Sequence, residues 1–137
     1  MQIKKLTPVL FVEAIEPCLP FWTERLGFAK TVEVPEGGKL GFVILVKDGV
    51  ELMYQTYASA EKDIPGLVRK PDLPGTFLYV EVAGLDEIKK RLAGVKLEVP
   101  QRTTFYGARE IGMREPGGNL ILFAEMAAAP EKEREAQ

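Results

Sequence analysis

The sequence predicts an α+β fold made of two consecutive βαβββ units. Short runs rich in Val, Ile, Leu and aromatic residues, typical of strands, alternate with turns that contain Gly or Pro. Two stretches carry apolar residues at helical spacing, and each is followed by a glycine. The same order of elements occurs twice, and the similar words LFVE (10–13) and LYVE (78–81) stand before the helix in each half. Such internal repetition constrains the fold more strongly than any single motif.

The first half begins with a predicted strand over residues 7–12. A helix is predicted next, because apolar side chains recur at helical spacing over residues 15–26 and Gly27 follows. Asp48-Gly49 is typical of a two-residue hairpin turn. The remaining strands of this half are predicted over residues 28–34, 40–46 and 50–56.

The second half repeats this order after an interruption. Residues 58–74 contain three prolines and scattered charges, so we predict a linker with one short helical turn there. A helix is predicted from Leu85, Ile88 and Leu92, and the strands are predicted over residues 77–82, 95–99, 109–114 and 119–125. The predicted organisation is a first module over 1–57, the linker over 58–74, a second module over 75–126 and a flexible tail over 127–137.

The composition excludes several classes of function. The chain has no histidine, which rules out Ser–His and Cys–His catalysis and any histidine-ligated metal. Cys18 is the single cysteine, so no internal disulfide forms, in keeping with a cytoplasmic location. A net charge of −2 without a basic run argues against nucleic acid as a partner. We expect no membrane partner either, because no apolar run approaches the ~20 residues of a membrane span.

Three local motifs point to a known superfamily. They are FWTERLGF (21–28), YGARE (106–110) and EPGGN (115–119). In this order, and over two repeats, they resemble the glyoxalase/bleomycin-resistance/dioxygenase superfamily, also called the vicinal oxygen chelate superfamily, over residues 6–125. The resemblance implies that each half curls its sheet into a half-barrel with the helix outside. It also implies that the concave face holds the ligand.

The resemblance argues against the metal-dependent members of that superfamily. Those enzymes place four metal ligands on the concave face, and the corresponding positions here are Thr7, Glu51, Phe77 and Leu122. Only Glu51 is able to bind a metal, whereas a catalytic divalent site needs about three protein ligands. We therefore predict no metal and no other cofactor.

The remaining resemblance is to bleomycin-resistance proteins, through Thr7-Pro8 at the start of the first strand and through YGARE (106–110). These proteins bind a cationic, aromatic glycopeptide without chemistry, usually as swapped dimers with clefts shared between subunits. The resemblance thus implies a homodimer and a small-molecule ligand. The linker leaves open whether the halves pair within one chain or between two.

Strand alternation selects the candidate ligand-binding residues. If Leu10 and Val12 pack on the helix, the alternate residues of each strand face the concave side. Aromatic residues near strand ends and one arginine add to this set, which mixes apolar and polar groups as ligand pockets do. The candidates are Phe11, Phe42, Glu51, Met53, Gln55, Phe77, Tyr79, Tyr106 and Arg109. The alternatives are that the apolar members are core, that Tyr106 is a dimer contact or a loop anchor, and that Arg109 pairs with Glu110 or Glu51.

Three further residues have two interpretations each. In apolar surroundings, the carboxylate of Glu51 must find a partner or its pKa must rise. Glu51 would recognise a cation on a ligand, form a salt bridge with Arg109 or Arg102, or lie at the surface if the strand register is shifted by one residue. Trp22 is predicted in the core rather than in a binding site. Cys18 is predicted to be a small apolar residue, the alternative being a reactive thiol.

The leading functional hypothesis is a metal-free protein that sequesters a small aromatic or cationic compound, such as an antibiotic, without catalysing a reaction. The first alternative is an enzyme of the lyase or isomerase type, with Glu51 as general base and Tyr79 or Arg109 stabilising the developing charge. The second alternative is a non-catalytic structural or regulatory partner.

Overall fold

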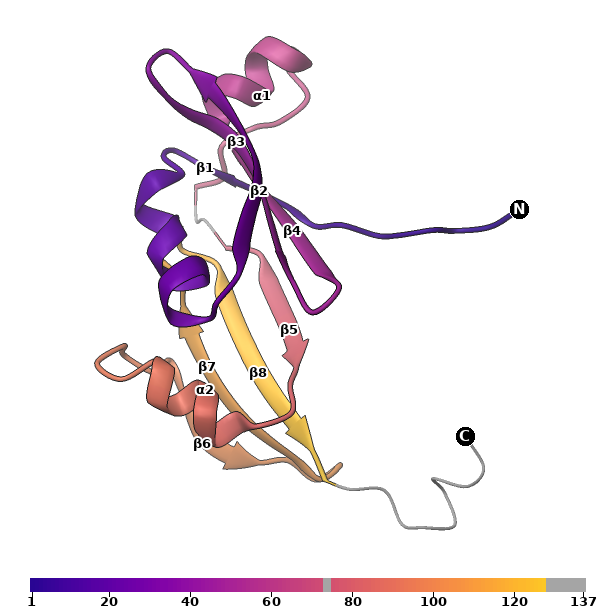
Figure 1. The fold of residues 1–137 in the computed structure, drawn as a ribbon, viewed down its shortest axis with the longest axis vertical. Coiled ribbons are helices and arrows are strands. Elements are labelled where there is room, and N and C mark those ends of the chain that lie inside the picture. Colours follow the sequence, from indigo (N-terminus) through magenta and orange to yellow (C-terminus); the bar gives the residue numbers. More distant parts are fainter. Residues whose placement is uncertain (73–74, 128–137) are drawn as a thin grey trace. The chain divides into compact units, whose positions relative to one another are not determined.

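The computed structural model describes residues 1–72 and 75–127 of the 137-residue chain. Contacts between residues divide the chain into two compact units. The first consists of Met1–Thr76 together with Glu115–Asn119, and the second of Phe77–Arg114 and the chain from Leu120 onward. Each unit contains one four-stranded mixed sheet, as Figure 1 shows. The predicted α+β fold with two repeats is therefore confirmed.

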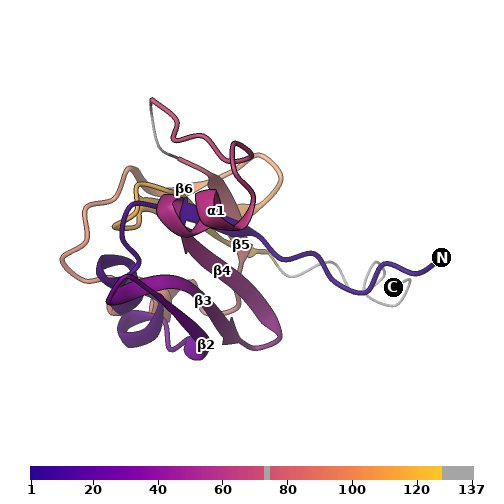
Figure 2. The same cartoon turned by 90° about the horizontal axis from the view of Figure 1, so that it is seen from above.

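The sheet of the first unit has the strand order β1-β4-β3-β2. Its edge strand β1 runs parallel to β4, and the other neighbours are antiparallel. Figure 2 shows β2, β3 and β4 as neighbouring strands. The strands are β1 (Val9–Val12), β2 (Ala29–Glu36), β3 (Lys39–Lys47) and β4 (Val50–Thr56).

The predicted first helix is present but is not a regular α-helix. A 3₁₀ turn, η1 (Glu16–Cys18), is followed by a π-helical turn, η2 (Phe21–Arg25). Pro20 lies between the two turns and has no backbone N–H to donate, which accounts for the interruption of regular α-helical bonding. The predicted hairpin turn between β3 and β4 is confirmed, because Asp48 and Gly49 both have positive φ, at 51° and 77°.

The core of the first unit lies between the sheet and the two helical turns. Along β3 and β4 every second side chain is buried, and the alternate ones are half-buried. The buried set includes Leu10 and Val12, so the predicted orientation of β1 is correct. Trp22 is also buried, which confirms its assignment to the core. The remaining members of this core are Ile15, Cys18, Phe21, Leu26, Val43, Leu45, Leu52 and Tyr54.

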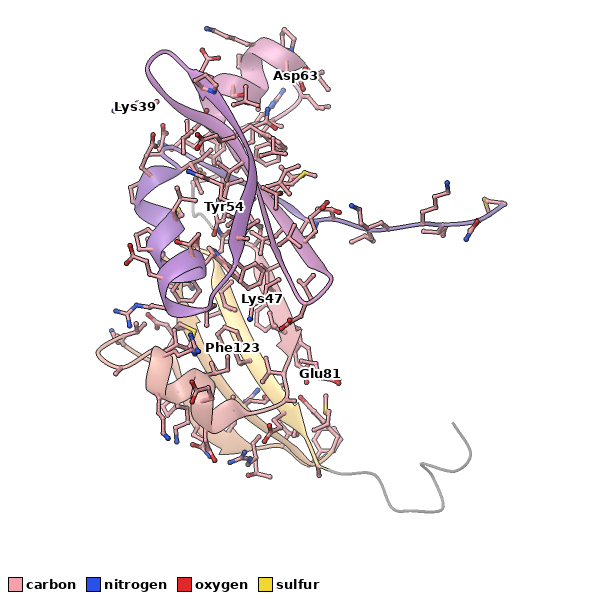
Figure 3. All side chains as sticks on the ribbon, viewed as in Figure 1. Lys39, Lys47, Tyr54, Asp63, Glu81 and Phe123 are labelled. Carbon is pink, nitrogen blue, oxygen red and sulfur yellow. The ribbon has the colours of Figure 1, made fainter. Side chains whose placement is uncertain are left out.

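A buried carboxylate is bound inside this core. Glu115 accepts hydrogen bonds from the Tyr54 hydroxyl and from the backbone N and side-chain Nδ2 of Asn119, the latter two at 2.6 and 3.0 Å. Tyr54, labelled in Figure 3, in turn accepts a bond of 2.8 Å from Trp22 Nε1. These bonds hold the turn between β7 and β8 in the first unit, since Asn119 Oδ1 also accepts from the backbone N of Thr76 at 2.9 Å.

Cys18 belongs to the same core. Burial, and then the nearby Glu115 carboxylate, raise the pKa of the Cys18 thiol to about 12. Because the thiolate is the reactive form, this environment opposes the reactive-thiol interpretation. Cys18 is the small buried residue that its position in the sequence predicts.

The second unit has the strand order β5-β8-β7-β6, with β5 parallel to β8. Its helix α2 (Leu85–Arg91) begins where the Glu125 carboxylate accepts bonds from the backbone N of Gly84 and Leu85. Leu85 and Phe123 are buried, and Phe123 is labelled in Figure 3. The strands are β5 (Phe77–Glu81), β6 (Val99–Thr103), β7 (Ala108–Arg114) and β8 (Leu120–Met126).

Two elements differ from the prediction. The strand expected over residues 95–99 is wrong, because β6 spans Val99–Thr103 and continues through Pro100. An edge strand tolerates proline, and the register of β6 against β7 is irregular between Val99 and Arg102. The linker carries the full helix α1 (Tyr57–Asp63), whose N-cap Thr56 accepts a bond of 3.1 Å from Ser59 N.

Most of the predicted tail, residues 128–137, lies outside the described residues. Within the described part of the chain, no helix is both long and apolar enough to cross a membrane.

Replacing Tyr54 by Phe tests the buried network. The substitution removes the hydroxyl that donates to Glu115 and accepts from Trp22, and so leaves two buried polar groups without this partner. We expect a loss of about 1–3 kcal/mol in the free energy of unfolding, measured by urea denaturation. Tyr57→Phe, at a half-buried position, is the matched control and is expected to change stability by less than about 0.5 kcal/mol. Equal effects of the two substitutions would contradict the role of the network.

Candidate functional site

The half-buried face of the first sheet contains five of the predicted ligand-binding residues. This first open face consists of Phe11, Phe42, Glu51, Met53 and Gln55, and η1 and η2 pack against the opposite face. Strand register brings these residues together, because Gln55 lies directly opposite both Phe11 and Phe42. A polar amide is thus flanked by two aromatic side chains in one row across three strands. Apolar walls with a few placed polar groups are typical of small-molecule sites.

Gln55 is held in place from the neighbouring helix. Its Nε2 donates to Ser59 Oγ of α1 at 3.2 Å. The Phe11 ring also contacts α1, since its centroid lies 6.5 Å from that of Tyr57 with an interplanar angle of 28°. The helix that follows β4 therefore orders one end of the first open face.

Glu51 lies on the same face and has partners that the sequence did not indicate. Lys5 Nζ lies 2.9 Å from its Oε1, and the Thr7 hydroxyl donates to the same oxygen at 3.1 Å. The hydrogen bond from Lys5 lowers the pKa of Glu51 below its ordinary value, so the carboxylate is ionised at neutral pH. Within the first unit the ion pair of Glu51 is therefore with Lys5, and the alternative salt bridge to Arg109 or Arg102 stays a prediction.

The resemblance aligns Thr7 and Glu51 with two of the four positions at which the superfamily's metal enzymes hold their ligands. The structure brings them together, but through a hydroxyl that donates to the carboxylate. In the described ranges no three His, Cys, Asp or Glu side chains gather closely enough to hold a metal ion. One hydroxyl and one carboxylate provide fewer donors than the roughly three protein ligands of a catalytic divalent site.

The second sheet presents aromatic side chains on the face opposite α2, here called the second face. Phe77 and Tyr79 of β5 are 57% and 45% exposed, and Tyr106, before β7, is 51% exposed. Desolvation, and then the Tyr106 hydroxyl, raise the pKa of Tyr79 to about 12. All three were predicted from the sequence, and they lie in the same unit.

Glu110 is the residue of this face that the sequence analysis missed. Its side chain is fully buried, with 0% exposure, and it accepts bonds from the hydroxyls of Tyr106 at 2.6 Å and Tyr79 at 3.4 Å. Arg102 binds its other oxygen through Nε at 3.0 Å and Nη2 at 2.9 Å. The hydrogen bond from Tyr106, followed by Arg102, lowers the pKa of Glu110, although burial acts in the opposite direction. An ionised carboxylate thus fixes the orientation of two tyrosines.

Arg109 is not brought to the second face. Alternation along β7 places it on the α2 side, where its Nη2 lies 2.6 Å from Glu125 Oε1 and its Nη1 lies 3.5 Å from Asp86 Oδ1. The alternative in which Arg109 pairs with Glu110 is therefore wrong. The motif YGARE (106–110) did contain a signal for Glu110. Because adjacent residues of a strand point to opposite faces, Arg109 and Glu110 cannot both face the ligand side of the sheet. A role of Arg109 in ligand binding stays a prediction.

The chain has the fold of the glyoxalase/bleomycin-resistance/dioxygenase superfamily, as the resemblance of its motifs predicted. A protein of that description from Nocardioides is similar at a TM-score of 0.70 and 18% identity, over 95% of this chain and 88% of the other. A bleomycin-binding protein from Streptomyces verticillus, complexed with copper(II)-bleomycin, is similar at a TM-score of 0.62 and 20% identity, over 94% and 99%.

A lactoylglutathione lyase from Agrobacterium tumefaciens is similar at a TM-score of 0.69 and 15% identity, over 91% of this chain and 95% of the other. No protein-family model matches the chain, and a search of curated proteins finds no match. At these identities the likeness establishes the fold that carries the candidate site.

The Glu110 cluster makes stability depend on pH. The pKa of the carboxyl group lies below its ordinary value of 4.5 in the folded protein. The ionised form therefore stabilises the fold above that value, and this contribution disappears as the pH falls through the lowered pKa. Glu110→Gln is expected to be less stable than the unchanged protein at neutral pH, with a gap that narrows in acid, as measured by urea denaturation.

Arg102→Gln and the double variant provide the control. With the double variant, the coupling free energy between Arg102→Gln and Glu110→Gln can be measured. It is expected to be present at neutral pH and to decrease in acid, because it requires the charged carboxylate. A stability gap independent of pH would contradict this account.

Proposed function

We propose that the chain is a metal-free binding protein for small aromatic or cationic molecules. The observation that carries this proposal is the position of the Gln55 amide between Phe11 and Phe42 on the half-buried first open face. The two rings provide apolar area for a planar ligand, and the amide provides a directional hydrogen bond. Such a surface binds by burial and orientation and requires no reacting group.

Glu51 supports a preference for cationic ligands. It lies on the same face of β4 as Gln55, four residues away, or about 13 Å along the strand. Its carboxylate already binds the Lys5 ammonium, so a positively charged group of a ligand has a partner of the right kind there. The bleomycin-binding protein among the similar structures supports an aromatic, cationic compound as the first ligand to test.

An enzymatic role for Glu51 receives less support. A general base works best with a pKa near the operating pH. Lys5 and Thr7 both stabilise the ionised carboxylate, and the pKa of Glu51 is lowered rather than raised. This favours recognition of a cation over proton abstraction.

The proposal predicts that the protein binds bleomycin. Isothermal titration calorimetry with metal-free and copper(II)-loaded bleomycin should give saturable binding. Phe42→Ala is expected to weaken it about tenfold by removing one ring of the first open face. Gln55→Leu, which keeps the apolar area and removes the amide, should weaken it about two- to tenfold.

Ile64→Ala is the matched control, because Ile64 is an exposed apolar residue outside the sheet and its loss should leave the affinity unchanged. Unchanged affinity in Glu51→Ala would remove Glu51 from the site while leaving a binding role intact. Failure of both forms of bleomycin to bind at their solubility limit would reject this ligand. Equal losses in Phe42→Ala and Ile64→Ala would reject the first open face.

We also propose that the protein acts as a homodimer, because the resemblance to bleomycin-resistance proteins implies one. The exposed apolar side chains Phe77 and Tyr79 are suited to burial against a second copy or a shared ligand. Sedimentation velocity of the full chain is expected to give twice the mass of one chain. A species that stays monomeric at all accessible concentrations would reject the dimer and leave single-chain binding to be tested by calorimetry.

A further inference from the structure

The first unit contains a cavity of about 350 Å³ beside the edge strand β1. Its walls include the rings of Phe11 and Tyr57 and the short apolar side chains that follow β1. This volume lies within the range of small-ligand sites, which is roughly 300–1,000 Å³. Apart from Phe11, no residue of the first open face lines it, so it is a separate place for a ligand.

The walls of the cavity are held firmly. Gly117, from the turn that Glu115 anchors, approaches Val12 so closely that a Cβ added at Gly117 would lie 2.8 Å from Val12 Cγ1. On the opposite side, the Tyr57 ring belongs to α1 and lies 6.5 Å from Phe11 between ring centroids. A ligand would therefore meet an aromatic surface that is already formed.

The charges at the cavity rim favour a cation. Glu13 and Asp72 contribute two carboxylates, and Lys70 contributes one ammonium group. Lys70 Nζ forms an ion pair with Glu13, whereas Asp72 forms no ion pair within the described residues. Aromatic faces attract ammonium groups. Lys70 shows that Glu13 binds an ammonium group at this cavity, whose lining also includes Tyr57.

We propose that this cavity binds a small aromatic ammonium compound, with its ring against Phe11 and Tyr57 and its ammonium group at Glu13. Lys70 is then an internal competitor rather than a recognition group, because both cations require the same carboxylate. The proposal of this second site is independent of the proposed function.

The test is a titration of the full-length, ¹⁵N-labelled protein with phenethylammonium, followed by amide chemical shifts. Shifts are expected at Val12, Ala14 and Gly117. Phenylacetate, the anionic analogue, and butylammonium, which lacks the ring, are each expected to bind about tenfold more weakly. Tyr57→Leu, which keeps an apolar side chain without the ring, should weaken phenethylammonium binding about tenfold.

Lys70→Met decides the role of the lysine. Removing the competitor frees Glu13, so binding of phenethylammonium should become about two- to fivefold tighter. Glu13→Gln should weaken it by a similar factor. Weaker binding in Lys70→Met, or phenylacetate affinity equal to that of phenethylammonium, would overturn the proposal.

Phe42→Leu separates this site from the proposed function. It alters the first open face and does not line the cavity, so phenethylammonium binding should be unchanged. If bleomycin fails to bind while these shifts appear, the proposed ligand fails and the cavity proposal stands. If phenethylammonium shifts residues of the first open face instead of those lining the cavity, the cavity proposal fails.

Discussion

The covering of one sheet face by apolar packing is the constraint on which the rest of this protein depends. In the first unit, alternate residues of β1, β3 and β4 are buried together with Trp22 and its neighbours on η1 and η2. Because side chains of a strand alternate between faces, burying one set places the other set together on the opposite face. The row of Phe11, Gln55 and Phe42 is a direct consequence of this packing. The packing that forms the core therefore also brings the residues of the candidate site together.

Carboxylates are the second organising feature, and each is bound by nearby donors in a different way. Glu115 is held by the Tyr54 hydroxyl and the amide groups of Asn119, without a cation among these bonds. Glu110 combines two phenols with the guanidinium of Arg102. Where a tyrosine is the donor, the carboxylate also fixes the direction of its ring. Buried charge thus orients aromatic surface at Tyr79 and Tyr106.

The two proposed ligand sites of the first unit use different chemistry although Phe11 contributes to both. On the first open face, Phe11 is one of two rings beside an amide that is suited to directional hydrogen bonding. In the cavity, it stands with Tyr57 beside a rim that carries two carboxylates and one ammonium group. Phe11 has this double role because β1 is an edge strand, so its side chain reaches both the sheet face and the open edge.

The sequence by itself determined the order of elements, the doubling of the βαβββ unit and the alternation along the strands. These features depend on local apolar periodicity and turn chemistry, and they suffice to bring Phe11, Phe42, Met53 and Gln55 to one face. Only the tertiary structure decided that Lys5 binds Glu51, that Arg109 binds Glu125, and that Glu110 is the buried anchor of Tyr106. Those choices depend on which side chains meet across distant segments, and a charged side chain accepts any opposite charge that the packing brings near it. The course of β6 through Pro100 has the same cause, since only the sheet order makes β6 an edge strand that tolerates proline.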